Sequence, residues 1–167
     1  MLSWENVFIL LMGDRKVTRT RMKNANGFYV DISKVETIPR DMTVIRIDGG
    51  EAYRIMQGGQ LVGGVVIKVN GERGDLDLLF VSPKVHSKGI GYAAWCAVEQ
   101  LHPEVKVWET VTPYFEKRNI HFYVNRCGFQ IVEFYNSHHP DPNDPETGQD
   151  MDEQFPDGMF RFEKEMQ

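Results

Sequence analysis

The segment LLFVSPKVHSKGIGYA, residues 78–93, decides the fold, because three kinds of local structure follow one another within it. Its apolar start predicts the end of a strand, Pro83 lies in a turn, and apolar residues recur at helical spacing from Ile90 to Leu101. Gly89 and Gly91 carry no side chain that would keep a ligand from the amides at the positive helix start. The segment therefore predicts a phosphate-binding turn, and the alternative is a tight connection without a ligand.

Two common nucleotide-binding motifs do not fit this turn. No Gly-Lys-Ser/Thr follows it, as a Walker loop requires. The third glycine and the downstream acidic residue of a dinucleotide fingerprint are also missing. A nucleotide ligand would therefore have to be of another class.

Strand and helix patterns extend from this turn in both directions. Upstream, the sequence predicts an antiparallel meander with strands at 43–47, 51–56, 61–69 and 75–81, and two earlier strands at 7–12 and 16–23. Downstream, it predicts a strand at 105–110, a helix that Thr112 caps and that runs from Pro113 to Gly128, and strands at 129–135 and 159–165. Prolines and carboxylates make residues 136–158 a long acidic loop.

One known family shares this arrangement. Val81-Ser-Pro followed by His86-Ser-Lys-Gly89-Ile-Gly91 resembles the pyrophosphate-binding signature of the GNAT superfamily of acyl-CoA-dependent N-acetyltransferases, Gln/Arg-x-x-Gly-x-Gly/Ala, with His86 in place of the usual first residue. The strand at 105–110 and the helix with Asn119-Ile-His-Phe-Tyr123 before Gly128-Phe129 follow in the expected order. The resemblance covers residues 51–135 and the last strand. Residues 1–45 depart from it, because family members carry there a helical pair that helps to shape the acceptor site.

The resemblance implies a fold and a cosubstrate. The expected fold is a single α/β (α+β) domain over residues 1–167, with a mixed, mostly antiparallel sheet, splayed central strands, flanking helices and an atypical β-rich segment at 1–45. The cosubstrate is acetyl-CoA, without a metal. Its expected binding residues are Val81, His86, Ser87, Lys88, Gly89, Ile90, Gly91, Tyr92 and Asn119.

Acetylation of an amine needs a proton acceptor, because an alkylamine with a pKa near 10.4 is neutral only about once in a few thousand molecules at pH 7. Asp75 and Asp77 alternate with Leu79 and Val81 on one face of their strand, and Glu109 lies near the end of the neighbouring strand. We expect one of these three carboxylates to be the general base, and the alternative for each is a solvated surface charge. By resemblance, a backbone N–H near Val81, where the strand bulges, would stabilise the oxyanion formed when the amine attacks directly in a ternary complex.

Tyr123 is the candidate proton donor to the leaving thiolate. It lies four residues after Asn119 and so on the same face of the predicted helix. The usual family pattern has the tyrosine four residues before the Gly of Gly-Phe, whereas Tyr123 is five before Gly128, and a one-residue bulge would reconcile the two. The alternative is an aromatic side chain that only packs the helix.

The composition narrows the classes of molecule that the protein is expected to bind. The chain has 167 residues, of which 41% are hydrophobic and 26% charged, as in one soluble globular domain. A net charge of −5 disfavours nucleic acid and favours cationic small molecules. The longest apolar run, Val7 to Met12, is too short to cross a membrane and no leader is visible, so the protein is expected to be cytoplasmic.

Two side-chain groups receive structural interpretations. Cys96 and Cys127 are expected to be reduced core residues, in preference to a nucleophilic pairing of Cys127 with His121. His138 and His139, with Asp141 and Asp144, lack a recognised metal-ligand spacing and are expected in a solvated loop.

The resulting hypothesis is an acetyl-CoA-dependent N-acetyltransferase that acts on the primary amine of a small, cationic molecule. The alternatives are a non-catalytic acyl-CoA-binding or regulatory module, and an acetyltransferase for protein lysines or N-termini. A homodimer is left open.

Overall fold

The computed structural model describes residues 19–23, 29–35, 50–85, 89–142 and 158–167. The chain forms two compact units, Met1–Val105 and Lys106–Gln167. The predicted strands at 7–12 and 43–47, residues 86–88 and most of the acidic connection lie outside the described residues. The expectation of a single domain therefore stays a prediction.

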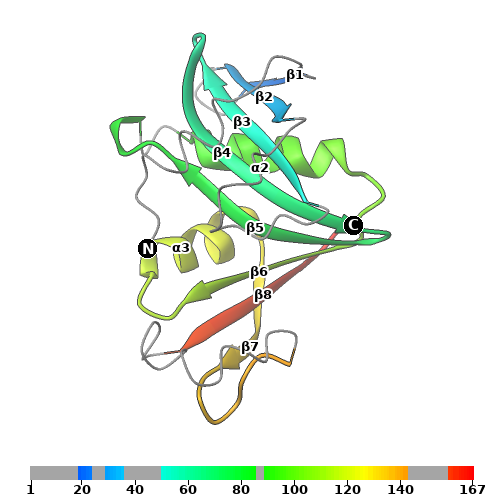
Figure 1. Cartoon of the computed structure of the whole chain (residues 1–167), viewed down its shortest axis with the longest axis vertical. Helices are drawn as coiled ribbons and strands as arrows, with labels where there is room; N and C mark the ends of the chain where they lie inside the picture. The colour runs from blue at the N-terminus through cyan, green and yellow to red at the C-terminus, as the bar shows by residue number, and fades with distance from the viewer. Residues whose placement is uncertain (1–18, 24–28, 36–49, 86–88, 143–157) are drawn as a thin grey trace, which may run out of the picture. The chain divides into compact units, whose positions relative to one another are not determined.

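Five antiparallel strands form the sheet of the first unit (Figure 1). They are β1 (Arg19–Lys23), β2 (Tyr29–Val35), β3 (Glu51–Gln57), β4 (Gln60–Asn70) and β5 (Arg73–Val81), paired in chain order. Gly58 and Gly59 have φ of 56° and 78° in the turn between β3 and β4, a conformation that glycine adopts without strain. The predicted strands at 51–56, 61–69 and 75–81 are confirmed as β3, β4 and β5. The strand predicted at 43–47 lies outside the described residues, and β2, which pairs with β3, was not predicted.

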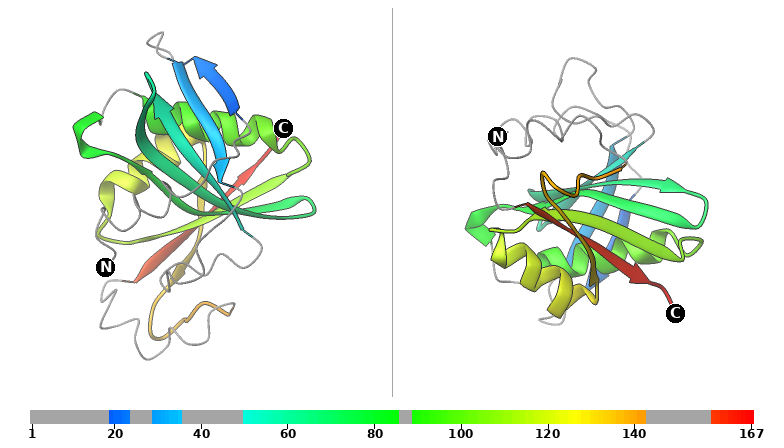
Figure 2. Two further views of the ribbon diagram at one scale, coloured as in Figure 1. Left: turned by 45° about the horizontal axis from the view of Figure 1, so that its top comes forward. Right: turned by 90° about the horizontal axis from the view of Figure 1, so that it is seen from below.

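The helix α2 (Ile90–Leu101) has the predicted bounds and lies against β1, β2 and β5 (Figure 2). Its buried side includes the small residues Ala93, Ala94 and Ala97, which let the helix approach the sheet closely. Ile55, Val65 and Ile67 of β3 and β4 are fully buried in the same unit. His102 ends the helix, as the His-Pro pair predicts, and its N–H donates to Val98 O at 3.2 Å.

A β-bulge in β5 changes the faces that the sequence predicts. Val66 pairs with Leu78 and Ile67 with Leu76, so Asp77 is an extra residue without a partner in the register. Side chains beyond the bulge therefore exchange faces, and Asp75 shares its face with Leu78 and Phe80. The prediction that Asp75 and Asp77 share a face with Leu79 and Val81 is wrong, because it assumed uninterrupted alternation.

Gly63 is a position where the sheet of the first unit admits no side chain. A Cβ there would lie 2.2 Å from Phe80 O and 3.1 Å from Val81 Cα. We expect Gly63→Ala to lower the free energy of unfolding by about 3 kcal/mol or more, because the two strands must separate. Urea denaturation measures this loss. In the control Gly58→Asn, at a turn position with open space, stability should change by under about 1 kcal/mol, and an equally small effect at Gly63 would contradict the prediction.

The described part of the second unit consists of a three-stranded antiparallel sheet and one helical segment. β8 (Met159–Glu165) pairs with both β6 (Val107–Pro113) and β7 (Gln130–Tyr135). The helical segment consists of α3 (Lys117–His121) and a π-helical turn, Phe122–Cys127, and it ends at Gly128 with φ of 81°. The predicted strands and the glycine terminator are confirmed.

The predicted helix start at Pro113 is wrong. Pro113 is the last residue of β6 and pairs with Met159, and Thr112 is a buried strand residue, not a helix cap. Glu116 N–H donates to Pro113 O at 3.0 Å, which closes a turn, and Ile120 N–H then donates to Glu116 O at 3.1 Å. The proline therefore opens a turn and the helix follows it.

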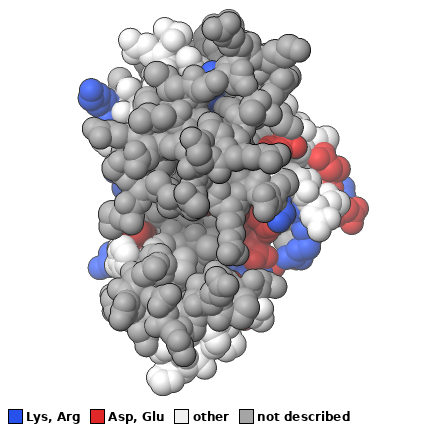
Figure 3. Space-filling view, viewed as in Figure 1, with Lys and Arg blue, Asp and Glu red and all other residues white. Residues whose placement is uncertain are grey.

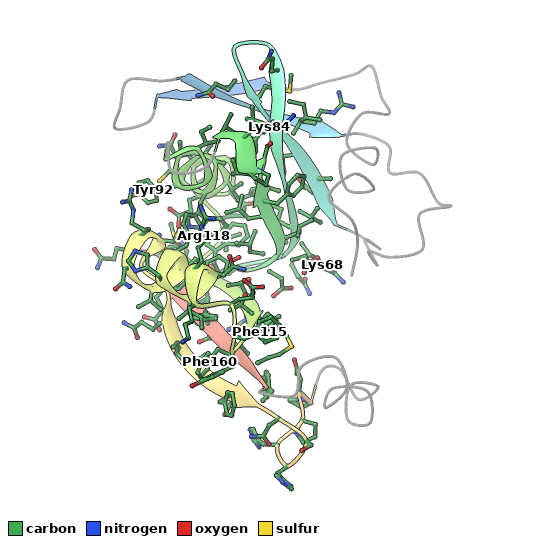
Figure 4. The ribbon with its side chains drawn as sticks, turned by 90° about the vertical axis from the view of Figure 1, so that its left-hand side faces the viewer. Lys68, Lys84, Tyr92, Phe115, Arg118 and Phe160 are labelled. Carbon is green, nitrogen blue, oxygen red and sulfur yellow. The ribbon has the colours of Figure 1, made fainter. Side chains whose placement is uncertain are left out.

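Aromatic side chains form the core of the second unit. Tyr123 packs against Phe129 and Phe162, with ring centroids 5.7 and 5.6 Å away, and Phe162 contacts Phe160 at 6.3 Å. Figure 4 shows Phe160 on β8, below the helix that carries Arg118. By register, Thr110 and Thr112 share the face of Phe162 and Phe160, so the helical segment lies on this face.

None of the described helices is long and apolar enough to cross a membrane. Neither Cys96 nor Cys127 forms a disulfide: Cys127 is buried, as expected for a core residue, and Cys96 is half-buried.

Candidate active site

The segment after β5 is the first part of the candidate site. Ser82 N–H donates to Val62 O at 2.7 Å, so the hydrogen-bonding groups of β5 that face β4 belong to residues 80 and 82. The N–H of Val81 therefore points away from β4. A single 3₁₀ turn, Pro83–Val85, follows.

The start of α2 is the second part. Gly89 precedes the helix with φ of 73°, a left-handed conformation that favours glycine, and Ala93 N–H donates to its carbonyl at 3.0 Å. The amides of Ile90 and Gly91 therefore lie at the open, positive end of the helix, whose first turn contains no acidic residue. Figure 4 shows Tyr92, which is exposed, on α2, and Lys84 on the 3₁₀ turn before it. His86, Ser87 and Lys88 lie outside the described residues.

Asp77 on β5 differs from an ordinary surface carboxylate in one respect. Desolvation by the surrounding chain raises the pKa of Asp77, the charge of Asp75 raises it further, and Lys68 opposes both. Asp77 is also the bulged residue of the strand. A carboxylate with a raised pKa is a stronger base than an ordinary aspartate.

Glu109 on β6 is engaged in an ion pair. Arg161 Nη1 donates to Glu109 Oε2 at 2.7 Å and to Glu163 Oε1 at 2.8 Å. Burial disfavours the charged guanidinium, but the hydrogen bond and the charges of the two carboxylates outweigh it and raise the pKa of Arg161. Arg161 therefore balances part of the negative charge of Glu109 and Glu163.

Asn119 and Tyr123 both point from the helical segment toward β6. Asn119 Nδ2 donates to Thr112 Oγ1 at 3.5 Å, and the Tyr123 hydroxyl is hydrogen-bonded to Thr110. Glu109 lies on the opposite face of the same strand. Within the second unit, the structure thus brings Asn119 and Tyr123 to one face of β6 and places Glu109 on the other.

The π-helical turn accounts for the unusual spacing of Tyr123. Gly128 N–H donates to Tyr123 O, five residues earlier, and Phe129 N–H donates to the same oxygen at 3.0 Å. A π turn contains one residue more than an α turn, so it is the one-residue bulge that the sequence comparison required. Tyr123 is 7% exposed.

Burial sets the acidity of Tyr123. Desolvation raises its pKa to about 12, Cys127 adds to this, and the hydrogen bond from Thr110 works against it. The phenol therefore keeps its proton at any physiological pH.

Thr110, Thr112 and Arg161 are site residues that the sequence reasoning missed. Thr110 and Thr112 are buried polar residues of the second unit, and each is hydrogen-bonded to a candidate site residue. The alternation Thr110-Val111-Thr112 was available as a signal, but Thr112 was interpreted as a helix cap. Arg161 is 52 residues from Glu109, so no local spacing could indicate their pairing.

No group of three metal-ligating side chains occurs among the described residues. His139 Nε2 lies 3.2 Å from Glu133 Oε1, and both side chains are exposed. His138 and His139 donate their backbone N–H groups to Asn136 Oδ1, as in a solvated turn.

Comparison with known proteins supplies a family match and a close relative. Residues 24–129 match the model of the acetyltransferase (GNAT) family, a span that includes both the turn before α2 and the helical segment with Tyr123. The chain is 49% identical over 136 residues to the uncharacterized protein YrkN of Bacillus subtilis. The aligned region covers 77% of this chain and 74% of the relative.

Solved structures share the fold at low sequence identity. A Bacillus subtilis acetyltransferase in complex with CoA has a TM-score of 0.61 at 19% identity and covers 81% of this chain and 98% of its own. A protein of the same family from Elizabethkingia anophelis, with acetyl-CoA bound, has a TM-score of 0.61 at 15% identity over 92% and 100% of the two chains. The IAA acetyltransferase of Bacillus cereus gives 0.61 at 22% identity over 82% and 99%. These likenesses confirm the expected fold class, a mixed sheet with flanking helices.

Proposed function

Since this chain belongs to the GNAT acetyltransferase family, we propose that it transfers an acetyl group from acetyl-CoA to the primary amine of a small, cationic molecule. The amine attacks the thioester carbon directly within a ternary complex. The C–N bond forms as the C–S bond breaks, the amine loses a proton, and coenzyme A leaves as a thiolate or thiol.

The observation that carries this proposal is the π-helical turn. This turn contains the extra residue between Tyr123 and Gly128, which supports the assignment of Tyr123 as the tyrosine of the family pattern. π turns recur at functional sites, because an irregular helix is kept where it directs a side chain. Asn119 lies on the same side of the helical segment and would contact the pantetheine arm.

The turn at Gly89 and Gly91 would hold the pyrophosphate of the coenzyme. Backbone amides at a helix start bind phosphate through hydrogen bonds and the helix dipole, and the left-handed Gly89 leads the chain into that start. The N–H of Val81, which points away from β4, would donate a hydrogen bond to the oxyanion of the tetrahedral intermediate.

Asp77 is the general base that we favour among the three candidates. Its pKa is raised by desolvation and by Asp75, whereas the Glu109 carboxylate is already paired with Arg161. The reaction needs an acceptor for the amine proton and can use a donor for the leaving thiolate, and these are the roles that we propose for Asp77 and Tyr123.

We expect Asp77→Asn to lower kcat/KM by about 10²-fold or more, because the variant removes the acceptor of the amine proton. The base works only when deprotonated, so wild-type kcat/KM should fall as the pH drops through the raised pKa of Asp77, and the variant should lose this acidic limb. Steady-state rates against pH measure both effects. In the controls Asp75→Asn and Glu109→Gln, losses should stay below about tenfold. If one of these controls instead loses the acidic limb, the base assignment moves to that residue.

Carboxylates on the strands of the second unit support the proposal that the acceptor is a cation. Glu109, Glu163 and Glu133 lie on β6, β8 and β7, and Arg161 balances only part of their charge. The described part of the surface in Figure 3 carries both signs side by side, so any preference for a cation would be local. Asp150, Asp152 and Glu153, in the connection between β7 and β8, lie outside the described residues.

Neutralising Asp150, Asp152 and Glu153 together should raise the acceptor KM by about two- to tenfold at low salt, because removing three negative charges weakens the attraction of the protein for cations. In the wild type, the acceptor KM should rise as salt shortens the Debye length toward about 8 Å. Kinetics at several ionic strengths measure both. An unaltered KM with unaltered salt dependence would leave these residues no steering role.

The function itself is tested by incubating the purified protein with acetyl-CoA and separate amines, polyamines, aminoglycosides and peptides while thiol release is followed. We expect the fastest release with small polycations. Faster release with peptides would indicate a protein acetyltransferase. Coenzyme binding without turnover on any amine would indicate a non-catalytic module.

A further inference from the structure

Four polar side chains form a hydrogen-bonded network at the C-terminal end of α2, within the first unit. Tyr53 on β3 donates its hydroxyl hydrogen to Glu51 Oε2. The Tyr53 oxygen lies 3.1 Å from His102 Nε2, and His102 Nδ1 lies 3.0 Å from Glu104 Oε1. The network thus runs Glu51, Tyr53, His102, Glu104 and joins the residue that ends α2 to the strand β3.

The middle of this network is buried and its ends reach solvent. Tyr53 is 5% exposed and the His102 side chain 11%, whereas the Glu51 and Glu104 side chains are 28% and 53% exposed. The rings of Tyr53 and His102 meet edge to face, with centroids 6.4 Å apart. Polar groups buried to this degree are destabilising unless their hydrogen bonds are made.

Counting hydrogens limits the protonation states that let every bond of the network form. The single hydroxyl hydrogen of Tyr53 goes to Glu51, so the Tyr53 oxygen must accept from His102 Nε2–H. The Glu104 carboxylate can only accept, so His102 Nδ1 must also carry a hydrogen. All three hydrogen bonds can therefore form together only when the network carries one proton more than it has with a neutral histidine ring.

That extra proton belongs on His102. The other arrangement would protonate Glu51 and let Tyr53 donate to a bare Nε2, but a carboxylic acid is ordinarily more acidic than an imidazolium by about two pKa units. A cation also suits the end of α2, where the helix dipole is negative. Glu51 Oε2 lies 3.8 Å from His102 Nε2, so carboxylates flank the ring on two sides.

The two neighbours of His102 keep their own protonation states. Burial, then the hydrogen bond and charge of Glu51, then the charge of Glu104 raise the pKa of Tyr53, which therefore stays protonated. The backbone and then His102 lower the pKa of Glu104, which therefore stays a carboxylate. Glu51 and Tyr53 face the ring from β3, and Glu104 faces it from its own segment; of these, Tyr53 and Glu104 cannot supply the missing hydrogen in place of the histidine.

We propose that His102 is a positioning residue whose doubly protonated ring fixes the C-terminal end of α2 to β3, and that loss of one ring proton loosens this helix. α2 is the helix whose first turn would hold the coenzyme, so the second part of the inference rests on the proposed function. As the pH rises and the ring loses a proton, one hydrogen bond is lost, and coenzyme affinity is expected to fall with it.

Glu104→Gln tests this directly, because an amide can accept from a protonated Nδ1 or donate to a bare one. The variant therefore keeps all three bonds with a neutral histidine, and its exposed position makes correct folding the expectation. Glu72→Gln, which removes one exposed carboxylate in the turn between β4 and β5, is the matched control for charge. Both variants and the wild type are compared at about pH 6 and about pH 8.5.

Three readouts follow, two of which need no coenzyme. The ¹⁵N shifts of the His102 ring in wild type should show hydrogen on both nitrogens at the lower pH. The unfolding equilibrium constant of the wild type, divided by that of Glu104→Gln, should be about tenfold larger at the higher pH than at the lower pH. The same ratio taken against Glu72→Gln should not show this increase. The dissociation constant of coenzyme A should be about two- to fivefold higher in wild type than in Glu104→Gln at the higher pH, and equal at the lower pH.

The outcomes separate the two proposals. A neutral ring at the lower pH, or parallel unfolding curves for wild type and Glu104→Gln, would overturn the role of His102. Equal coenzyme affinities at both pH values, with the unfolding result as expected, would overturn the positioning of α2. If coenzyme A binds to no variant, the proposed function fails, while the unfolding and ¹⁵N readouts still decide the protonation of His102.

Discussion

Replacement of Gly91 by tryptophan is expected to abolish coenzyme A binding, which a calorimetric titration would show as the loss of all binding heat. Gly91 is the second residue of α2, next to the fully buried Ile90, and its amide lies at the open end of the helix. Amides bind a pyrophosphate only when its oxygens approach to about 3 Å, and an indole at this position would occupy the same space. The expected loss is large because the side chain excludes the ligand from every amide of the turn.

Gln100→Trp is the matched control for this experiment. Gln100 is exposed near the other end of α2, so the same indole on the same helix should leave coenzyme affinity within about twofold of wild type. Circular dichroism would establish that both variants are folded. If folded Gly91→Trp binds the coenzyme with unchanged affinity, the turn is only a tight connection between β5 and α2.

The elements around this turn could be predicted because local signals agree there. β3, β4 and β5 are rich in apolar residues and are separated by glycine-containing turns, and α2 has a glycine before it and His-Pro after it. Each of these signals acts within a few residues, where sequence patterns are informative. The bounds of α2 were accordingly predicted without error.

The start of the helical segment could not be predicted because one residue type serves two structures. Proline is favoured in the first turn of a helix and is also tolerated at the end of a strand. At Pro113 the pairing with Met159, 46 positions further along the chain, decides between them. The bulge at Asp77 is a similar case, because only the register against β4 shows which residue is extra.

The polar contacts that refine the site are equally non-local. Tyr53 and His102 are 49 residues apart and Glu109 and Arg161 are 52 residues apart, so their hydrogen bonds leave no spacing signal in the sequence. The exception is the bulge near Tyr123. It could be inferred because the spacing to Gly128 exceeded the family pattern by one residue, and a π turn is the local structure that absorbs one residue.

The acidity of Tyr123 limits how it can assist the leaving group. A free thiol has a pKa near 8.5, whereas burial raises that of Tyr123 to about 12. Complete transfer of the phenol proton to the thiolate would therefore be unfavourable by about 5 kcal/mol before any change on coenzyme binding. Tyr123 is thus better suited to donate a hydrogen bond to the developing sulfur anion, and general acid catalysis should contribute at the lower end of its usual range.

For this reason we expect Tyr123→Phe to lower kcat by about 10²-fold while the dissociation constant of coenzyme A stays within about twofold. The phenyl ring keeps the contacts with Phe129 and Phe162, so the core should stay packed and only the hydroxyl and its bond to Thr110 are lost. Because the phenol stays protonated to about pH 12, the wild-type rate should show no alkaline decline from Tyr123 below about pH 11. Thr110→Val is the matched control: it removes the partner of the phenol and leaves the donor, so its kcat should fall by less than about tenfold. A Tyr123→Phe rate within twofold of wild type would show that the aromatic ring only packs the helical segment.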